Sequence, residues 1–296
     1  MCDITYPAKK TNTRVLILGA TGMLGNTMLR FFAQSAGFVA FGSARSSRAL
    51  KLLPPYLSQH VVCGVDVENM DSLVNLFTKT RPDIVINCIG LVKQLAEAND
   101  ALIAIPINTL LPHRLARLCE VARARLVHLS TDCVFSGAKG MYTESDTADA
   151  TDLYGRSKYI GEVDFPHAIT LRTSIIGHEL NGARSLVNWF LSQEGEVKGF
   201  KRAIFSGLPT VEVARVIRDY VIPHPQLHGL YHLSAAPINK FELLELVAST
   251  YGKSIGINPD EELIIDRSLD STRFRRATGF IPKPWPTLIS DMHEFG

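Results

Sequence analysis

Short apolar runs alternate with amphipathic segments through the first half of the chain. Residues 15–18 are continuously apolar and end at Gly19, which is typical of a strand buried on both faces. Leu24, Met28 and Phe32 then recur at helical spacing. The same alternation predicts further strands at 38–41, 60–67, 84–87 and 125–129, and helices at 71–80 and before Arg123. Such an order favours a doubly wound parallel sheet with helices on both faces.

The alternation is looser after a further strand predicted at 169–176. Leu186, Trp189 and Phe190 predict a helical segment within 181–201. Further on, the pattern predicts helices at 211–222 and 241–251 and a strand at 229–233. The proline-rich segment 282–286 is expected to form neither regular helix nor a central strand. We therefore expect a second, smaller domain folded closely onto the first.

The composition mainly excludes certain classes of protein and kinds of binding site. The chain has 296 residues, of which 46% are apolar and 20% charged, and this excludes a disordered, collagen-like or coiled-coil protein. The formal net charge of +2 predicts no general attraction to nucleic acid or to an anionic membrane. Five isolated cysteines predict neither a metal site nor a disulfide framework. Without a signal peptide or an apolar run of about 18 residues, we expect a cytoplasmic protein.

The first candidate for chemistry is the sequence GATGMLG at 19–25, between the first predicted strand and its helix. Glycines at this place allow a tight turn, and the free N–H groups and dipole of the helix start favour a phosphate group. The spacing is GxxGxxG and not the GxGxxG of the common dinucleotide site. An ordinary turn would also contain glycines, but the strand–turn–helix context favours dinucleotide binding.

The end of the second predicted strand bears on the choice of dinucleotide. NAD sites usually carry an acidic residue about 20 residues after the glycine turn. Here the chain continues as GSARSSR at 42–48, without an acid. Ser43 and Arg45 would suit the 2′-phosphate of NADPH, because a guanidinium donates two N–H groups to phosphate oxygens. The alternative is an exposed basic loop; together with the glycine turn, the segment favours NADPH.

Tyr154 and Lys158 are four residues apart and therefore lie on one side of a predicted helix. The pKa of a free tyrosine is about 10, so at neutral pH the side chain exchanges protons only if a nearby cation stabilises its phenolate. Lys158 could supply that charge and also bind the nicotinamide ribose. A Tyr-x-x-x-Lys pattern alone is commonly a solvated helix face. Here it gains weight because it follows the Ser-Thr-Asp strand end at 130–132.

Together these motifs resemble those of the extended short-chain dehydrogenases/reductases, and most closely the dTDP-4-dehydrorhamnose reductase family. The resemblance runs from Arg14 nearly to the end of the chain and rests mainly on GATGMLG at 19–25, STDCVFSG at 130–137 and YGRSK at 154–158. It implies an α/β protein, with a Rossmann-type doubly wound parallel sheet and a small C-terminal α/β substrate-binding domain. We expect the NADP-binding domain at 14–180, with 205–235 returning to it, and the substrate-binding domain at 181–204 and 236–296.

The resemblance also implies roles for individual residues. Tyr154 is the implied proton donor, Lys158 its electrostatic partner and a ribose ligand, and Thr131 the hydroxyl that binds the substrate carbonyl. Asn108 is an implied support of the active site, and Asp132 an implied substrate contact. The implied cofactor ligands at the glycine turn and the following strand ends are Gly19, Thr21, Gly22, Met23, Leu24, Asp66, Val67, Cys88, Ile89 and Gly90.

Several of these residues also have ordinary explanations. Asp66 could simply cap the next helix, Asn108 could be a common polar position, and Asp132 could bond only to its own turn. Arg202 and Arg273 lie in the half of the chain with which the family holds the nucleotide diphosphate. Either could bind a phosphate of the substrate, or both could be plain surface arginines.

We predict an NADPH-dependent reductase of the 4-keto group of a nucleotide-activated 6-deoxyhexose. Cys133 replaces the acid–base Glu of related dehydratases, and Ile175 replaces a Trp common in reductases, so the sugar stays open. Some reductases of the family use magnesium, but we recognise no acidic ligands for it here and predict no metal. A nucleotide-sugar epimerase and a non-catalytic, dinucleotide-binding regulatory subunit are the alternatives. The expected partner is a nucleotide-diphosphate sugar, and the sequence leaves a homodimer open.

Overall fold

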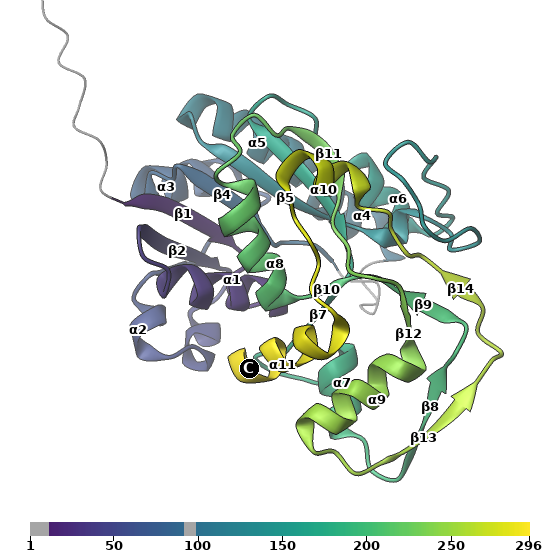
Figure 1. Ribbon diagram of the computed structural model, residues 1–296. Coiled ribbons are helices and arrows are strands. Elements are labelled where there is room, and N and C mark those ends of the chain that lie inside the picture. The colour runs from purple at the N-terminus through teal and green to yellow at the C-terminus, as the bar shows by residue number, and fades with distance from the viewer. Residues whose placement is uncertain (1–11, 92–98) are drawn as a thin grey trace, which may run out of the picture.

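The computed structural model describes residues 12–91 and 99–296 (Figure 1). Seven strands form one sheet in the order β11-β6-β5-β4-β1-β2-β3, and all neighbouring pairs are parallel. They are β1 (Thr13–Leu18), β2 (Phe38–Ala44), β3 (Val61–Cys63), β4 (Ile84–Asn87), β5 (Arg125–Thr131), β6 (Ala168–Thr173) and β11 (Gly229–His232). The order reverses between β1 and β4, which is where open α/β sheets bind ligands. The predicted doubly wound parallel sheet is confirmed.

Helices cover both faces of this sheet. Val15 and Ile17 of β1 enter one hydrophobic core, and Leu16 and Leu18 enter the other, as expected for a strand buried on both sides. The first core packs α1 (Met23–Ala33), α8 (Thr210–Val216) and α11 (Trp285–Phe295), and the second packs α3 (Met70–Thr80) and α5 (Leu111–Ala122). The continuous apolar runs of the sequence thus fill two cores, one on each side of the sheet.

The remaining strands form small sheets in the C-terminal half of the chain. β8 (Glu196–Phe200) pairs with β13 (Gly256–Asp260), β9 (Ala203–Phe205) lies between β12 (Ile238–Asn239) and β14 (Ile265–Asp266), and β7 (Ile175–Ile176) pairs with β10 (Leu208–Pro209). α9 (Lys240–Tyr251) packs on β8 and β13, at the lower right of Figure 1. β11 returns from this half to the edge of the large sheet. The boundaries of the two predicted domains stay a prediction.

Two segments differ from the sequence pattern at glycines. The helix predicted within 181–201 covers only α7 (Leu186–Ser192), and the chain then continues as β8. Gly195, with φ 80°, makes the turn between them. The strand predicted at 60–67 ends at Cys63, because Gly64 has φ 74° and turns the chain there. Both glycines adopt backbone conformations that other residues disfavour.

The prediction that 282–286 forms no helix holds for 282–284 and is wrong for Trp285 and Pro286. α11 begins at Trp285, and Pro286 lies in its first turn, where a missing N–H removes no helical hydrogen bond. Trp285 is buried and donates from Nε1 to the carbonyl oxygen of Ala236 at 2.7 Å. The prolines therefore set the start of the last helix instead of preventing it.

The shorter helical elements complete the chain. They are η1 (Ser47–Leu52), α2 (Pro55–Ser58), α4 (Ala101–Ala104), the π-helical η3 (Ile105–Leu110), η4 (Asp132–Val134), α6 (Leu153–Ile160), the π-helical η5 (Ile217–Val221) and α10 (Thr272–Thr278). α6 packs against β5, η3 and η4. This places the helix that carries Tyr154 directly over the end of β5.

Candidate active site

The glycine turn joins β1 to α1 and is held from β2. Gly19 has φ 78°, and its N–H donates to the hydroxyl of the buried Ser43 at 3.3 Å. The N–H of Ala20 donates to the carbonyl oxygen of Ser43 at 3.0 Å. A Cβ on Gly25 would overlap the carbonyl oxygen of Gly19, so α1 can approach the turn this closely only with glycine at that position. Ser43 therefore supports the turn from inside the protein.

The start of α1 faces this turn with free backbone donors. Gly22 is the N-cap residue in an extended conformation, and no described side chain caps the helix. The first N–H groups of an uncapped helix have no partner within the helix, and together with the helix dipole they attract a phosphate group. The predicted ligands Thr21, Met23 and Leu24 lie in this same stretch. The turn thus has the features that a pyrophosphate requires.

The other predicted cofactor residues lie at the carboxyl ends of neighbouring strands. Arg45 follows β2 and is exposed, and Asp66 follows β3 and is exposed, with Val67 buried next to it. A carboxylate oxygen of Asp66 accepts from the N–H of Glu68 at 3.0 Å, while the cap of α3 is Asn69. Asp66 therefore bonds within its own loop and does not cap the helix.

The end of β4 touches the glycine turn. A Cβ placed on Gly19 would lie 2.9 Å from Cγ1 of Ile89 and 3.6 Å from the carbonyl carbon of Cys88. A Cβ on Gly90 would lie 3.6 Å from Oδ1 of Asn108 and 3.8 Å from Nζ of Lys158. The structure therefore brings the predicted residues of β1, β4 and α6 to one edge of the sheet.

Thr131 and Tyr154 meet where β5 ends and α6 begins. Gly155 permits this contact, because a Cβ at its position would overlap the carbonyl oxygen of Cys133. The side chain of Thr131 lies close enough to Tyr154 to act on the pKa of its phenol. Thr131 donates its hydroxyl to Oδ1 of Asp132 at 3.2 Å and accepts from the N–H of Cys133 at 3.1 Å. The predicted proton donor and the predicted carbonyl-binding hydroxyl are thus direct neighbours.

The surroundings of Tyr154 keep its phenol protonated. Burial raises the pKa of Tyr154 above its usual value, and the neighbouring Cys133, Asp132 and Asp152 raise it further. The polar side chain of Thr131 acts in the opposite direction and lowers the pKa. At neutral pH the side chain therefore carries the proton that a general acid must donate.

Lys158 is buried, with Nζ donating to the carbonyl oxygen of Leu129 at 2.8 Å. Burial lowers the pKa of Lys158 to about 8, while the charge of Glu162 raises it. The ammonium is therefore charged at neutral pH and neutral not far above it. It lies beside Gly90 at the end of β4, where the resemblance implies the ribose.

Asn108 connects the end of β4 to α6. It is buried in η3, donates from Nδ2 to the hydroxyl of Ser157 at 3.2 Å and accepts at Oδ1 from the N–H of Leu91 at 2.9 Å. α6 approaches η3 so closely at Gly161 that a Cβ there would overlap the carbonyl oxygen of Asn108. Asn108 is therefore placed where it could support the active site, and this supporting role stays a prediction.

Two cations that no sequence motif indicated act on Asp132. Arg267 follows β14 and donates from Nε to the carbonyl oxygen of Phe135 at 2.7 Å. Burial raises the pKa of Asp132 above its usual value, and the charges of Arg267 and Lys240 oppose this rise without cancelling it. Both cations lie far along the chain from residues 130–132, so no local sequence pattern could connect them with Asp132. Only the tertiary structure shows this proximity.

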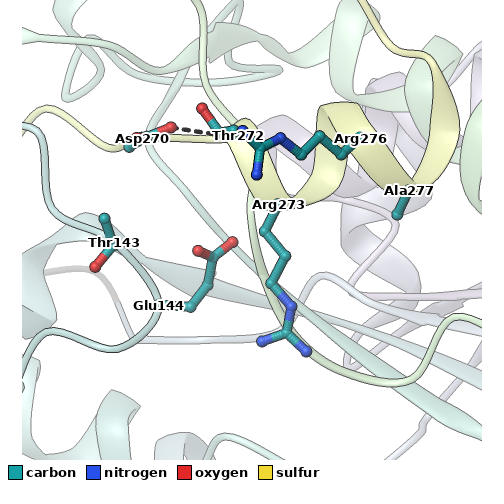
Figure 2. Close-up of a pocket in the computed structure, with 7 residues that line it drawn as sticks. All are labelled: Thr143, Glu144, Asp270, Thr272, Arg273, Arg276 and Ala277. Atoms are coloured by element: carbon teal, nitrogen blue, oxygen red, sulfur yellow. Dashed lines mark hydrogen bonds between the residues drawn. The ribbon is translucent and has the colours of Figure 1, made fainter.

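Arg202 and Arg273 are exposed side chains of the C-terminal half. Arg202 is exposed between β8 and β9, and Arg273 is exposed on α10, with its guanidinium 4.6 Å from the ring centre of Tyr231. Arg273 lines a pocket of about 570 Å³ together with Thr143, Glu144, Asp270, Thr272, Arg276 and Ala277. Figure 2 shows these side chains. Neither Thr131 nor Tyr154 lines this pocket. The role of Arg273 in phosphate binding stays a prediction.

Residues 12–91 and 99–296 contain neither a candidate metal cluster nor a candidate membrane span. In these ranges no group of three His, Cys, Asp or Glu side chains could hold a metal ion. In the same ranges no helix is long and apolar enough to cross a bilayer.

Comparison with known proteins places the chain in a family. The model of the RmlD substrate binding domain matches residues 13–263. A dTDP-4-dehydrorhamnose reductase of Mycobacterium tuberculosis is 31% identical over 171 residues, which span 54% of this chain and only 49% of that protein. Methionine adenosyltransferase 2 subunit beta of Danio rerio is 28% identical over 254 residues, 80% of this chain and 74% of that protein.

A solved structure agrees in fold. The dTDP-4-dehydrorhamnose reductase of Bacillus anthracis, crystallised in complex with NADP, has a TM-score of 0.76 at 21% identity and covers 96% of this chain and 100% of its own. At this identity the likeness concerns the fold. The family match spans most of the chain and confirms the resemblance drawn from its motifs. The chain therefore belongs to the family of the RmlD substrate binding domain.

Proposed function

We propose that the protein is an NADPH-dependent reductase of the 4-keto group of a nucleotide-activated 6-deoxyhexose. The observation that carries this proposal is the convergence of Thr131, Tyr154 and Lys158 beside the glycine turn at one edge of the sheet. Relatives named dTDP-4-dehydrorhamnose reductase, and one of them crystallised with NADP, support the substrate class and the cofactor. The reaction converts a ketone, a hydride and a proton into an alcohol.

The glycine turn fits the dinucleotide. The pyrophosphate would lie on the uncapped start of α1, where a side chain at Gly25 would displace the helix. Arg45, exposed after β2, would hold the 2′-phosphate, and Lys158 the ribose next to the nicotinamide. When bound, NADPH supplies the hydride.

The protein's own groups handle the proton and orient the ketone. Tyr154 donates its phenolic proton to the developing alkoxide oxygen. In the structure Thr131 donates its hydroxyl to Asp132, so this hydroxyl must rotate toward the carbonyl oxygen when a substrate binds. Lys158, four residues further along α6, would stabilise with its positive charge the phenolate left on Tyr154 after proton transfer.

The two alternatives differ in what they require. An epimerase with bound NAD would normally carry an acid at the end of β2, where this chain has Ala44 and Arg45. A regulatory subunit is favoured by the relatives named methionine adenosyltransferase 2 subunit beta. Such a protein would not need Tyr154 and Lys158, whereas both are present here and lie beside the predicted cofactor residues.

An NADPH-oxidation screen separates these functions. TDP-, GDP- and UDP-linked 4-keto-6-deoxy sugars are each mixed with the protein and NADPH, and the product is identified by NMR. We expect oxidation of NADPH with at least one of them and an alcohol at C4. Binding of NADPH without oxidation in any of the mixtures would reject the reductase and favour the regulatory subunit.

Arg45→Ala should weaken NADPH binding much more than NADH binding. The variant loses a charge-assisted hydrogen bond to the 2′-phosphate, which costs on the order of 1.5–3 kcal/mol, or roughly tenfold or more in affinity. Titration of both cofactors measures the difference. Lys51→Ala is the control, because Lys51 is exposed in the next element and has no assigned role. Equal losses for both cofactors, or a wild-type preference for NADH, would contradict the assignment.

NADPH affinity and kcat/KM should fall as the pH rises through about 8. This is the pKa to which burial lowers Lys158, so the ammonium is charged below it and neutral above it. The free energy of unfolding changes in the opposite direction and rises with pH.

Below about pH 8 the buried ammonium destabilises the folded protein. This destabilisation disappears as the pH rises from about 8 to 10.5, the ordinary pKa of lysine. Titrations and unfolding curves over this range therefore separate loss of the charge from unfolding. A constant NADPH affinity across pH 8 would show that the ammonium does not hold the cofactor.

A further inference from the structure

Ser130 lies directly before Thr131 and is bound to the segment that follows α6. Its hydroxyl donates to Oε1 of Glu162 at 2.7 Å, and Ser130 is only 5% exposed. Glu162 lies two residues beyond the end of α6, the helix that carries Tyr154 and Lys158. This bond therefore connects the strand of Thr131 with the helix of the other two predicted catalytic residues.

Glu162 is itself held in place from β6. Its two carboxylate oxygens accept from Nε and Nη2 of Arg172, each at 2.7 Å. The N–H of the next residue, Val163, donates to the hydroxyl of Thr170 at 3.1 Å, and this hydroxyl donates to the carbonyl oxygen of Val163 at 2.9 Å. These contacts do not involve Ser130, so the carboxylate of Glu162 is a fixed acceptor for the Ser130 hydroxyl.

Strand geometry transmits this restraint from Ser130 to Thr131. Ser130 is paired in register with Arg172 of β6, so the two side chains lie on the same face of the sheet. Successive side chains of a strand point to opposite faces, so β5 cannot rotate about its own axis at Ser130 without moving Thr131. The hydroxyl of Thr131 accepts from the N–H of Cys133 at 3.1 Å. The bond between Ser130 and Glu162 therefore acts on the orientation of Thr131 and on the turn that follows it.

We propose that Ser130 is a positioning residue, whose hydrogen bond with Glu162 fixes the place of Thr131 relative to Tyr154 and Lys158. Neither Ser130 nor Glu162 is one of the predicted ligands of the cofactor, so loss of the bond should displace a reacting hydroxyl and leave the dinucleotide site intact. A displacement of about 1 Å at a reacting group can lower turnover by roughly 10²-fold. The effect on turnover rests on the proposed function, but the effect on the place of Thr131 does not.

The test compares Ser130→Ala, which removes the hydroxyl, with Ser130→Thr, which keeps it. The ion pair of Glu162 with Arg172 remains in both variants. The matched control is Ser234→Ala, because Ser234 is also a buried serine, 3% exposed, whose hydroxyl donates to a single acceptor, the carbonyl oxygen of Leu269, at 2.8 Å. Ser234→Ala thus removes a buried serine hydrogen bond that involves no predicted catalytic residue.

Amide hydrogen exchange of Cys133, followed by NMR, reports the place of Thr131 without any substrate, because this N–H donates to the hydroxyl of Thr131. In Ser130→Ala we expect the Cys133 amide to exchange roughly tenfold faster than in the wild type. Ser130→Thr and Ser234→Ala should both stay near the wild-type rate. A Cys133 exchange rate in Ser130→Ala equal to that of the wild type overturns the proposal.

Kinetics give the second measurement. In Ser130→Ala kcat should fall by roughly tenfold or more with NADPH affinity unchanged, and Ser130→Thr should restore most of the turnover. An equal fall of kcat in Ser234→Ala would mark a general loss of packing and also overturns the proposal. If the wild type reduces no keto sugar, hydrogen exchange still decides the role of Ser130, and only the proposed function fails. If Ser130→Ala does not fold, Ser130→Cys replaces it, because a thiol is only a weak donor, and an unchanged Cys133 exchange rate then overturns the proposal in the same way.

Discussion

Tyr154→Phe should lower kcat by roughly 10²–10⁴-fold and leave NADPH affinity nearly unchanged. The substitution removes one oxygen and keeps the ring, so the packing of α6 on the end of β5 is preserved. The lost group is the proton donor to the alkoxide, which is needed only in the transition state. Steady-state rates with a substrate from the NADPH-oxidation screen, together with NADPH titrations, measure the two effects separately.

Lys158→Met provides the comparison for this prediction. Lys158 is proposed to hold the ribose as well as the charge beside Tyr154, so its loss should reduce turnover and NADPH affinity together. If Tyr154→Phe retains more than about a tenth of wild-type turnover, its loss is smaller than the low end of general-acid effects. Tyr154 would then not be the acid.

Arg172→Met should lower the free energy of unfolding by about 3–5 kcal/mol. Arg172 is almost completely buried and binds both carboxylate oxygens of Glu162, each at 2.7 Å. Its third contact is Nε2 of His232 at 3.3 Å, which accepts from Nη1 because burial and the Arg172 charge lower the pKa of His232 to about 4. Without the guanidinium, the largely buried carboxylate of Glu162 loses its bidentate partner and keeps the hydroxyl of Ser130 and the charge of Lys158. Urea unfolding followed by circular dichroism measures the loss.

Two controls identify the cause of that loss. The double variant Arg172→Met with Glu162→Gln removes the unpaired charge as well, so it should recover a large part of the stability. Arg117→Met breaks the exposed pair with Glu120, in which the two side chains are 68% and 55% exposed, and should cost at most about 1 kcal/mol. If Arg172→Met lowers the free energy of unfolding no more than Arg117→Met does, the pair of Arg172 and Glu162 does not stabilise the fold.

The same buried pair reaches the active site. Ser130, directly before Thr131, donates its hydroxyl to Oε1 of Glu162 at 2.7 Å. The charge of Glu162 also raises the pKa of Lys158 against the effect of burial. The double variant should therefore keep the fold and still shift the alkaline fall of NADPH affinity to lower pH.

The sequence by itself determined the large sheet and the catalytic motifs. Strands that are buried on both faces have continuous apolar sequences. Because they alternate with amphipathic helices, only a few sheet topologies are compatible with the sequence. The glycine turn and the Tyr154–Lys158 pair were also readable, because the chemistry of each depends on neighbours within one turn or one helix. Periodicity failed where single glycines or prolines changed the local backbone, as at Gly195 and Pro286.

The tertiary structure alone decided the electrostatics of the site. Whether Lys158 is buried, whether Asp132 meets a cation and which arginine lies near the catalytic turn depend on contacts between residues far apart in the chain. The sequence indicated Arg202 and Arg273 as phosphate ligands, and no motif in it indicated Arg267. Desolvation and Coulomb interactions depend on the distances between side chains in the folded protein, and the sequence pattern does not contain those distances.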